Sequence, residues 1–335
     1  MRTYLAALLL IVKMAAAQTP HVHQLPATPQ TVAWGYYSAA AQPVLHVASG
    51  DIVVVHTMLT NVPDRLEKAG LPPAKVQQAL RDITTQVTDK GPGGHILTGP
   101  IAVDGAEVGD VLEVRFLKIR PDIDYGYNGC SGFLKENCAD SGRTRIIQLD
   151  TVHMTASLGP DITIPLQPFF GSMGNAPPPD SGRLSSNPPG MHAGNLDNKY
   201  LVAGTTLYIP VFAPGALFEI GDGHVAQGDG EVDQTAIETS LMGRIQLIVR
   251  KDMHLTWPRA ETPTYYITMG TDKDLTQATK VAVQEMIAFL TSTRGLSTME
   301  AYRLASIAAD LHITELVDGN VGVHMMIPKA IFKKH

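Results

Sequence analysis

A segment of eleven residues, GDGHVAQGDGE (221–231), most constrains how this chain can fold. It places three carboxylates, an imidazole and an amide among residues that are nearly all glycine or small. If its backbone is extended, side chains alternate between two faces, so Asp222 shares a face with His224. Such a segment buries little apolar surface and loses much backbone entropy on ordering. Its polar groups therefore indicate a site in which they hold a metal ion, a substrate or each other.

The composition predicts a folded protein with a large core. Of the 335 residues, 44% are hydrophobic and 17% are charged, which is typical of a globular chain with one or two domains. The formal net charge is -6, and no basic run is longer than the pair Lys333–Lys334. We therefore expect no nucleic-acid partner, whereas an acidic balance suits cations.

The first residues resemble a secretory signal. Arg2 precedes an apolar run over 5–12, and three alanines end at Ala17, which is the layout of a signal with an A-x-A cleavage site. A membrane anchor fits less well, because the run is far short of about 20 residues and Lys13 interrupts it. We expect a signal peptide over 1–17, and a secreted or periplasmic mature domain over 18–335 without a membrane span.

The two cysteines, Cys130 and Cys138, lie eight positions apart in a polar, glycine-rich stretch. An exported protein meets an oxidising compartment, which favours a local disulfide. A nucleophilic thiol is the alternative, but only Lys135 lies nearby to lower a thiol pKa. We expect the structural disulfide.

Short apolar runs predict strands through most of the chain. Region 121–198 is rich in Gly, Pro, Ser and Asn and is expected to form long loops. One early helix is expected over 74–87, after two prolines. The runs at 101–103 and 111–117 are expected to form a hairpin. The other predicted strands are 44–47, 52–55, 205–211, 216–220 and 244–249.

Two helices are expected near the C-terminus. Asp274 is the expected N-cap of a helix that ends near Thr293. Ser297 and Glu300 form a capping-box pattern that opens a second helix. The fold class is therefore α+β and β-rich, a sandwich-like or barrel-like β body with a C-terminal helical hairpin. The expected apolar face of the second helix comprises Tyr302, Leu304, Ile307, Ala308 and Leu311.

Two further clusters accompany the opening segment. In HAGNLDN (192–198), Asn195 and Asp197 share a face if the backbone is extended, and a β-hairpin could bring this cluster to residues 221–231. The loop GPGGH (91–95) is glycine-rich and ends at His95. It lacks the Lys-Ser/Thr pair of a phosphate-binding loop, so we do not expect a nucleotide.

These places together resemble the acetamidase/formamidase family. The matching blocks run in family order, and the resemblance extends over most of the chain, although Val108 stands where the family commonly has proline. The resemblance implies a β-rich α+β fold, homo-oligomers, and hydrolysis of small linear amides to a carboxylate and ammonia with a divalent metal such as zinc. The blocks are GPGGHILTGPI (91–101), GAEVGDVL (105–112), PGMHAGNLD (189–197) and GDGHVAQGDGEV (221–232).

Amide hydrolysis defines what these residues must supply. An amide carbonyl is a poor electrophile, so the reaction needs a Lewis acid or oxyanion donors, an activated water and a proton source for the amine. Imidazole and carboxylate ligands suit zinc. We expect Asp222 and His224 to be ligands, joined by His95 or His192, with His56 as a lesser alternative. Structural calcium stays open, although the D-x-D-x-D-G pattern is absent.

The remaining polar residues receive supporting roles. Glu231 is the expected general base, and Asn195 and Gln227 are expected to orient the amide. Asp197 or Asp229 is expected to be a ligand or to hold a histidine ligand. We interpret the other internal histidines as structural, namely His46, His153, His254, His312 and His324.

The alternative is a non-catalytic, secreted β protein that binds a metal or a carbohydrate. Such a protein would more often expose aromatic rings, but aromatic residues make up only 6% of this chain, with tryptophan only at 34 and 257. The sequence also lacks the G-x-S-x-G pattern of a serine hydrolase. A metal-dependent amidase is therefore the expected function.

Overall fold

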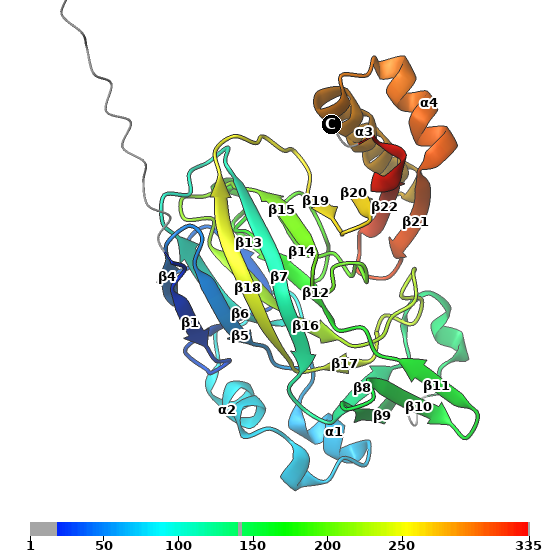
Figure 1. Ribbon diagram of the computed structural model, residues 1–335. Coiled ribbons are helices and arrows are strands. Elements are labelled where there is room, and N and C mark those ends of the chain that lie inside the picture. The colour runs from blue at the N-terminus through cyan, green and yellow to red at the C-terminus, as the bar shows by residue number, and fades with distance from the viewer. Residues whose placement is uncertain (1–18, 140–142, 334–335) are drawn as a thin grey trace, which may run out of the picture.

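The computed structural model describes residues 19–139 and 143–333, so the predicted signal peptide at 1–17 lies outside the described residues. Within these ranges the strands form sheets of nine, eleven and two strands. The helices lie at opposite ends of this β body (Figure 1). The predicted β-rich α+β fold is confirmed.

The nine-stranded sheet is antiparallel except where β1 pairs with β5. Its long central strands are β7 and β18, which pair along most of their length. In spatial order the strands are β1 (Val22–Leu25), β5 (Ile52–His56), β18 (Leu241–Arg250), β7 (Val111–Pro121), β15 (Thr206–Pro210), β19 (Arg259–Glu261), β20 (Tyr265–Asp272), β22 (Val321–Pro328) and β21 (Asp310–Glu315).

The eleven-stranded sheet carries the polar clusters. Its main path is β11 (Ile162–Pro165), β10 (Thr155–Gly159), β9 (Thr144–Asp150), β8 (Tyr125–Gly129), β17 (Glu238–Thr239), β16 (Phe218–His224), β12 (Phe169–Gly174) and β14 (Ala193–Asn195). Off this path, β6 (Ile96–Val103) pairs with β16, β2 (Val32–Trp34) and β4 (Leu45–Val47). The small sheet joins β3 (Tyr36–Ser38) and β13 (Arg183–Ser185).

The expectation of long loops over 121–198 was wrong, because this region carries strands β8 to β14. Its glycines and prolines separate short strands that pair with one another, as β8 to β11 do, or with strands elsewhere in the chain, as β12 does with β16. In the same region Cys130 and Cys138 form the predicted disulfide.

The two large sheets share one hydrophobic core. Val114 on β7 and Ile245 on β18 belong to the same buried cluster as Phe170 on β12 and Phe218 on β16. This sandwich explains why the expected hairpin between 101–103 and 111–117 was wrong. β16 and the pair β2 and β4 take the pairing positions on β6, so the chain crosses to the other sheet to form β7.

The early helical region is shorter and more divided than the expected helix over 74–87. Val76 is extended, with φ -66° and ψ 123°, so the helix begins only at Gln78. Leu80 and Ile83 are buried as their spacing predicts. The short helical segments of the structure are α1 (Pro63–Lys68), η1 (Pro73–Lys75), α2 (Gln78–Gln86), η2 (Gly132–Asn137), η3 (Pro179–Ser181) and η4 (Lys329–Ile331).

The two predicted C-terminal helices are α3 (Leu275–Arg294) and α4 (Thr298–Ala308), which pack together beside β20 and β22 (Figure 1). Asp274 caps α3 by accepting from the Gln277 amide at 2.9 Å, and Ser297 caps α4 by accepting from the Glu300 amide at 3.2 Å. Both predicted caps are confirmed. The helices are followed by β21 and β22, so they do not end the chain.

The predicted apolar face of α4 was wrong in part, although Leu304 packs against the core as expected. Ala301 and Ala305 are buried, whereas Tyr302 is 60% exposed and Ile307 is 82% exposed. Leu311 is half-exposed and lies in β21 rather than in the helix. The small alanine side chains, rather than the large apolar ones, allow α4 to approach its neighbours.

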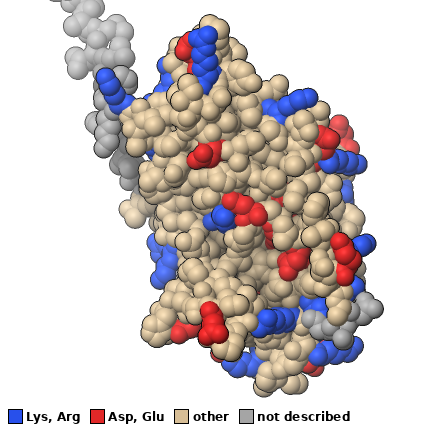
Figure 2. Space-filling view, turned by 90° about the vertical axis from the view of Figure 1, so that its right-hand side faces the viewer, with Lys and Arg blue, Asp and Glu red and all other residues tan. Residues whose placement is uncertain are grey.

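The surface shows no segregation of charge on the face drawn in Figure 2, where basic and acidic side chains are interspersed around a hollow. Across the described ranges, every helix is too short or too polar to cross a membrane.

Candidate active site

Strand β12 brings two of the polar clusters together. It lies between β14 and β16, and its residue Ser172 is paired with Asn195 on one side and with Gly221 on the other. The expected hairpin between the clusters is therefore replaced by an intervening strand. On the far side of β16, Leu97 pairs with Gly221, which places His95 near the same end of the sheet.

A glycine on β12 allows these side chains to meet. A Cβ atom at Gly171 would collide with the side chains of Asp197, Asp222 and His224. The strand therefore leaves open the space that these three side chains occupy.

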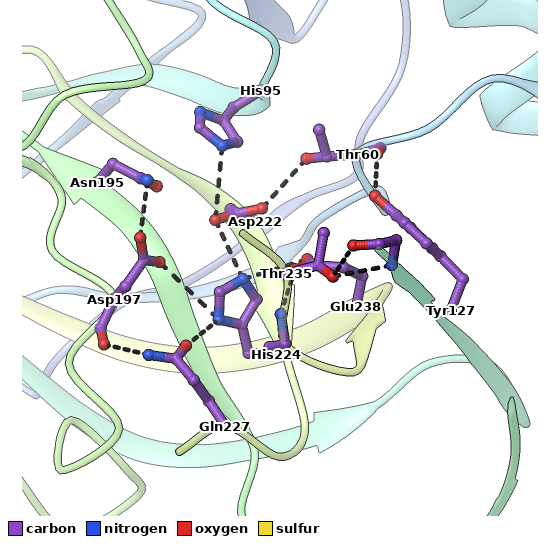
Figure 3. A network of polar contacts seen from close by, with 12 residues as sticks. Thr60, His95, Tyr127, Asn195, Asp197, Asp222, His224, Gln227, Thr235 and Glu238 are labelled. Carbon is purple, nitrogen blue, oxygen red and sulfur yellow. Dashed lines mark hydrogen bonds and ion pairs between the residues drawn. The ribbon is translucent and has the colours of Figure 1, made fainter. Parts of the chain in front are cut away.

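The imidazole of His224 is at the centre of the site (Figure 3). Its Nδ1 lies 2.8 Å from Gln227 Oε1, and Gln227 Nε2 donates to the carbonyl oxygen of Asp197 at 2.7 Å. Because the amide group of Gln227 donates to that carbonyl, its Oε1 accepts the proton of His224 Nδ1, an assignment made from the hydrogen-bond network. His224 Nε2 then faces Asp222 Oδ2 at 3.2 Å and Glu238 Oε2 at 3.1 Å.

A second histidine approaches Asp222 from the loop before β6. His95 Nε2 lies 3.7 Å from Asp222 Oδ2, and His95 Nδ1 lies 3.0 Å from the carbonyl oxygen of Ser186. Thr60 donates to Asp222 Oδ1 at 3.3 Å. Asp222 therefore lies between two imidazoles and is held from a third direction (Figure 3).

The opposite side of the site is acidic. Asn195 Nδ2 donates to Asp197 Oδ2 at 2.8 Å and to Asp318 Oδ2 at 3.0 Å. Asp197, His224 and Glu231 each offer a ligand atom within 4.8 Å of the others. Asn195 thus joins two carboxylates on the side of the site where Glu231 lies.

Three acidic residues of the site have strained backbones. Asp197, Asp222 and Glu231 have φ values of 46°, 56° and 40°. Residues other than glycine rarely adopt this left-handed region, and such strain concentrates at functional sites because the surrounding structure must enforce it.

Burial and neighbouring charges shift the pKa values of the central pair. Burial opposes protonation of His224, but Glu238 and Asp222 outweigh it and raise the pKa of the imidazole well above its usual value. Burial also opposes ionisation of Asp222, but His95 and His224 outweigh it and lower the pKa of this carboxyl. The pair is thus held in charged forms by mutual attraction.

The other carboxyls show the opposite shift. Burial raises the pKa of Asp197, Glu231, Glu238 and Asp318, and neighbouring carboxylates raise those of Asp197 and Glu231 further. Burying so many acidic groups together is costly without a compensating positive charge.

The donor atoms fit a divalent cation. Within the described residues, Asp197 Oδ1 is a buried side-chain atom without a hydrogen-bond partner, while the buried His224 Nε2 and Glu238 Oε2 face each other at 3.1 Å. Asp222, His224 and Glu238 also form a group whose ligand atoms lie within 4.8 Å of one another. Imidazole nitrogen with carboxylate oxygen is a donor set that suits zinc and related ions.

Six of the residues predicted from sequence line one cavity of about 60 Å³. They are His95, Asn195, Asp197, Asp222, His224 and Glu231, joined by Thr60, Tyr127, Gln234, Thr235, Glu238 and Asp318. Glu231 also lines a larger groove of about 620 Å³ beside this cavity.

The structure places the other predicted residues differently. Gln227 contacts His224 from outside the cavity lining. His192 is buried edge-on against Tyr37, with ring centroids 5.0 Å apart, and does not line the cavity. His56 pairs with Asp122.

Asp229 also lies elsewhere. Its Oδ2 is 3.1 Å from Lys199 Nζ and 3.2 Å from His312 Nδ1, so it belongs to a separate cluster.

Three cavity residues carry no functional signal in the sequence. Glu238 lies in an ordinary strand sequence, Asp318 lies in a turn-like VDGN stretch, and Thr60 follows β5. Only Asp318 lies in a recognisable pattern, that of a turn, and a turn does not indicate a functional site.

Comparison with known proteins gives consistent matches. Residues 74–185 and 181–334 match the sequence model of the Acetamidase/Formamidase family. A formamidase from Methylophilus methylotrophus is 29% identical over 192 residues, which cover 41% of this chain and 47% of that protein. The chain matches about half the length of the curated relatives.

Solved structures match over nearly the whole chain. An acetamidase from Yersinia enterocolitica has a TM-score of 0.80 at 26% identity, covering 96% of both chains. An acetamidase from Bacillus halodurans has a TM-score of 0.78 at 28% identity, covering 92% of this chain and 98% of that one.

Proposed function

The chain belongs to the acetamidase/formamidase family, and from this premise we propose that it hydrolyses small linear amides of the formamide and acetamide class to a carboxylate and ammonia. The observation that carries the proposal is the set of buried donors around His224 in a cavity of about 60 Å³. A cavity of that volume is several times what one water molecule requires, so it suits a small substrate.

We assign a divalent cation, zinc in this proposal, to Asp222, His224 and Glu238, with His95 beside Asp222. When bound, such a cation polarises the amide carbonyl and lowers the pKa of water. The imidazole donor favours zinc over calcium, which takes six to eight oxygen ligands. The buried His224 Nε2 and Glu238 Oε2, which face each other at 3.1 Å, support this assignment.

Glu231 is the residue that we assign to proton transfer. Burial raises its pKa, which brings the carboxyl closer to the range in which it can both take and give a proton near neutral pH. It takes a proton from the attacking water and passes it to the departing nitrogen, which leaves as ammonia, and the carboxylic acid formed releases its remaining proton to solvent and becomes the carboxylate.

Asn195 is the residue that we assign to orienting the amide. Its Nδ2 donates to Asp197 and Asp318, which leaves its Oδ1 buried and without a partner in the described part of the chain. That oxygen can accept a hydrogen bond from the NH₂ group of a primary amide. Gln227 instead holds the His224 imidazole, so we assign it a positioning role.

Ammonia release from formamide, acetamide and a longer amide tests the proposed activity. We expect release by zinc-loaded protein and its loss in Glu231→Gln, while the zinc content of that variant stays unchanged. Glu107→Gln is the matched control, because Glu107 is exposed and pairs with Lys251 on the surface. Zinc-loaded wild-type protein that releases no ammonia from any amide favours the non-catalytic alternative.

We also propose that the chain is exported after cleavage behind Ala17. The disulfide between Cys130 and Cys138 supports export, because such bonds persist in oxidising compartments. N-terminal sequencing of the exported protein should begin at Gln18, and recovery only of reduced, uncleaved protein in the cytoplasm contradicts export.

Homo-oligomers form a further part of the proposal. Tyr302, Ile307 and Leu311 are exposed apolar side chains on α4 and β21, and they provide apolar surface for contact between copies. Light scattering should give a mass that is a multiple of the monomer, whereas a monomer mass at high concentration contradicts this assignment.

A further inference from the structure

A second cluster of metal-binding side chains lies outside the cavity around His224. His312 and His324 face each other across β21 and β22, with parallel rings at 2° and centroids 4.9 Å apart. Asp229 Oδ2 lies 3.2 Å from His312 Nδ1. Each of the three residues offers a ligand atom within 4.8 Å of the others. We propose that Asp229, His312 and His324 form a second site for a divalent transition-metal ion such as zinc.

The state of His324 supports a ligand role. This residue is fully buried, and its Nδ1 lies 2.7 Å from Thr314 Oγ1. Its Nε2 is buried and has no hydrogen-bond partner within the ranges that the structure describes. A buried polar atom without a partner is unfavourable, and a metal ion would supply the missing interaction.

The cluster is accessible from outside. The side chains of Asp229 and His312 are 26% and 29% exposed, and Asp229 also lines the groove of about 620 Å³. Tyr200 packs edge-on against both imidazoles, with centroid distances of 5.9 Å to His312 and 5.3 Å to His324. One carboxylate and two imidazoles leave coordination positions for water, as three-ligand zinc sites do.

Lys199 competes with a metal ion for the carboxylate of Asp229. Its Nζ lies 3.1 Å from Asp229 Oδ2, and its side chain is 29% exposed. The ammonium group balances the Asp229 carboxylate when no metal is bound, and its flexible stem allows it to move into solvent when one is bound.

Because of the position of the cluster, a bound ion would connect separate elements of the fold. Gly230 donates to the carbonyl of Thr314 at 3.0 Å and accepts from the Leu316 amide at 3.1 Å, so the loop after β16 already contacts the end of β21. An ion held by Asp229 and the two histidines would join this loop, two residues before Glu231, to both strands of the β21–β22 pair.

The number of zinc ions bound per chain tests the inference. Equilibrium dialysis of the oxidised mature protein, followed by elemental analysis, should show one zinc fewer in His312→Asn than in wild type. His153→Asn is the matched control, because His153 also pairs with an aspartate, at 2.7 Å from Asp150, but that pair lacks the second imidazole. Equal zinc numbers in wild type and His312→Asn overturn the inference.

A second variant covers the case in which His312→Asn fails to fold. Lys199→Met removes the competing ammonium, so zinc should bind the second site about fivefold more tightly, near the upper end of what a surface ion pair contributes. Unchanged zinc affinity in Lys199→Met overturns the inference in that case. Both readouts measure binding, and failure of the proposed amidase activity leaves them unaffected.

Discussion

At the scale of single residues, the two nitrogens of His224 have different roles. Nδ1 contacts the Gln227 amide, and Nε2 faces the carboxylates of Asp222 and Glu238. Groups that fix the far nitrogen of a histidine ligand orient its ring and select its tautomer. Gln227 therefore acts on the metal through His224 and not by direct contact.

Removal of this support should weaken metal binding. Gln227→Ala is expected to lower zinc affinity by about 10-fold to 100-fold, because the His224 ring loses the group that orients it. A competition titration with a chromophoric chelator measures this change. Gln167→Ala is the control, since Gln167 has an exposed side chain and, like Gln227, lines the groove of about 620 Å³. Equal zinc affinities for Gln227→Ala and wild type would remove Gln227 from the positioning role.

The acidic partners of His224 show what the sequence could not predict. Asp222 lies two positions from His224, so its proximity follows from local sequence. Glu238 is the cross-strand partner of His224 between β16 and β17, and only the strand register brings the two together. Directly opposed residues in an antiparallel pair lie on the same face, but the register is unknown before the sheet forms.

His192 shows the reverse case, because its local pattern suggested a ligand. The next two residues, Ala193 and Gly194, both have φ of 72°, so the chain turns sharply at this point. The imidazole packs against Tyr37 and away from the cavity that Asn195 reaches. Residue type and spacing predicted the cluster, whereas the backbone turn decided which of its members reach the site.

At the scale of elements, the close approach of α3 to β20 depends on one glycine. A Cβ atom at Gly270 would meet the carbonyl oxygen of Ala278 and the amide of Ala282, which are backbone atoms that have little freedom to move. The small residues Ala278 and Ala282 complete this contact from the helix.

Gly270→Ala should therefore destabilise the protein by about 1–3 kcal/mol, because it overpacks the contact between helix and sheet. Urea unfolding measures the difference. Gly159→Ala is the control, since a Cβ there meets nothing within 4 Å, and its effect should stay within about 0.5 kcal/mol. Equal unfolding midpoints for Gly270→Ala and wild type would show that α3 can move away without cost.

The helices also show which structural features depend on neighbouring residues in the sequence and which depend on tertiary packing. The caps at Asp274 and Ser297 depend on residues within one turn, and both were predicted. The buried face of α4 depends on how closely it approaches its neighbours, which selected Ala301 and Ala305 over the larger Tyr302. Some strand positions outside 121–198 were likewise predictable, but the strands within that region and the partners across the two sheets were not.

At the scale of the whole molecule, buried histidines make the stability of the fold depend on pH. Burial lowers the pKa of His192 to about 4. The ordinary value of about 6.5 applies in the unfolded chain. Between these values the unfolded chain binds a proton that the folded chain does not, so stability falls as pH drops through this window.

This one imidazole should cost about 2 kcal/mol of stability between pH 7 and pH 5. His192→Gln is expected to lose correspondingly less over the same range, as measured by urea unfolding at both pH values. His153→Gln, in which an exposed histidine is replaced, should retain the wild-type pH dependence. The same pH dependence in His192→Gln and wild type would contradict the assignment.

The sandwich as a whole places three distant segments around one imidazole, and the proposed chemistry depends on a cation held there. Ammonia release from acetamide by metal-stripped protein, followed as zinc is added back, tests this dependence. We predict no release before zinc is added, a rise to a plateau as zinc binds, and no release from Glu231→Gln at any zinc level. Full release by the stripped protein, or none by wild-type protein saturated with zinc, would contradict a metal-dependent amidase.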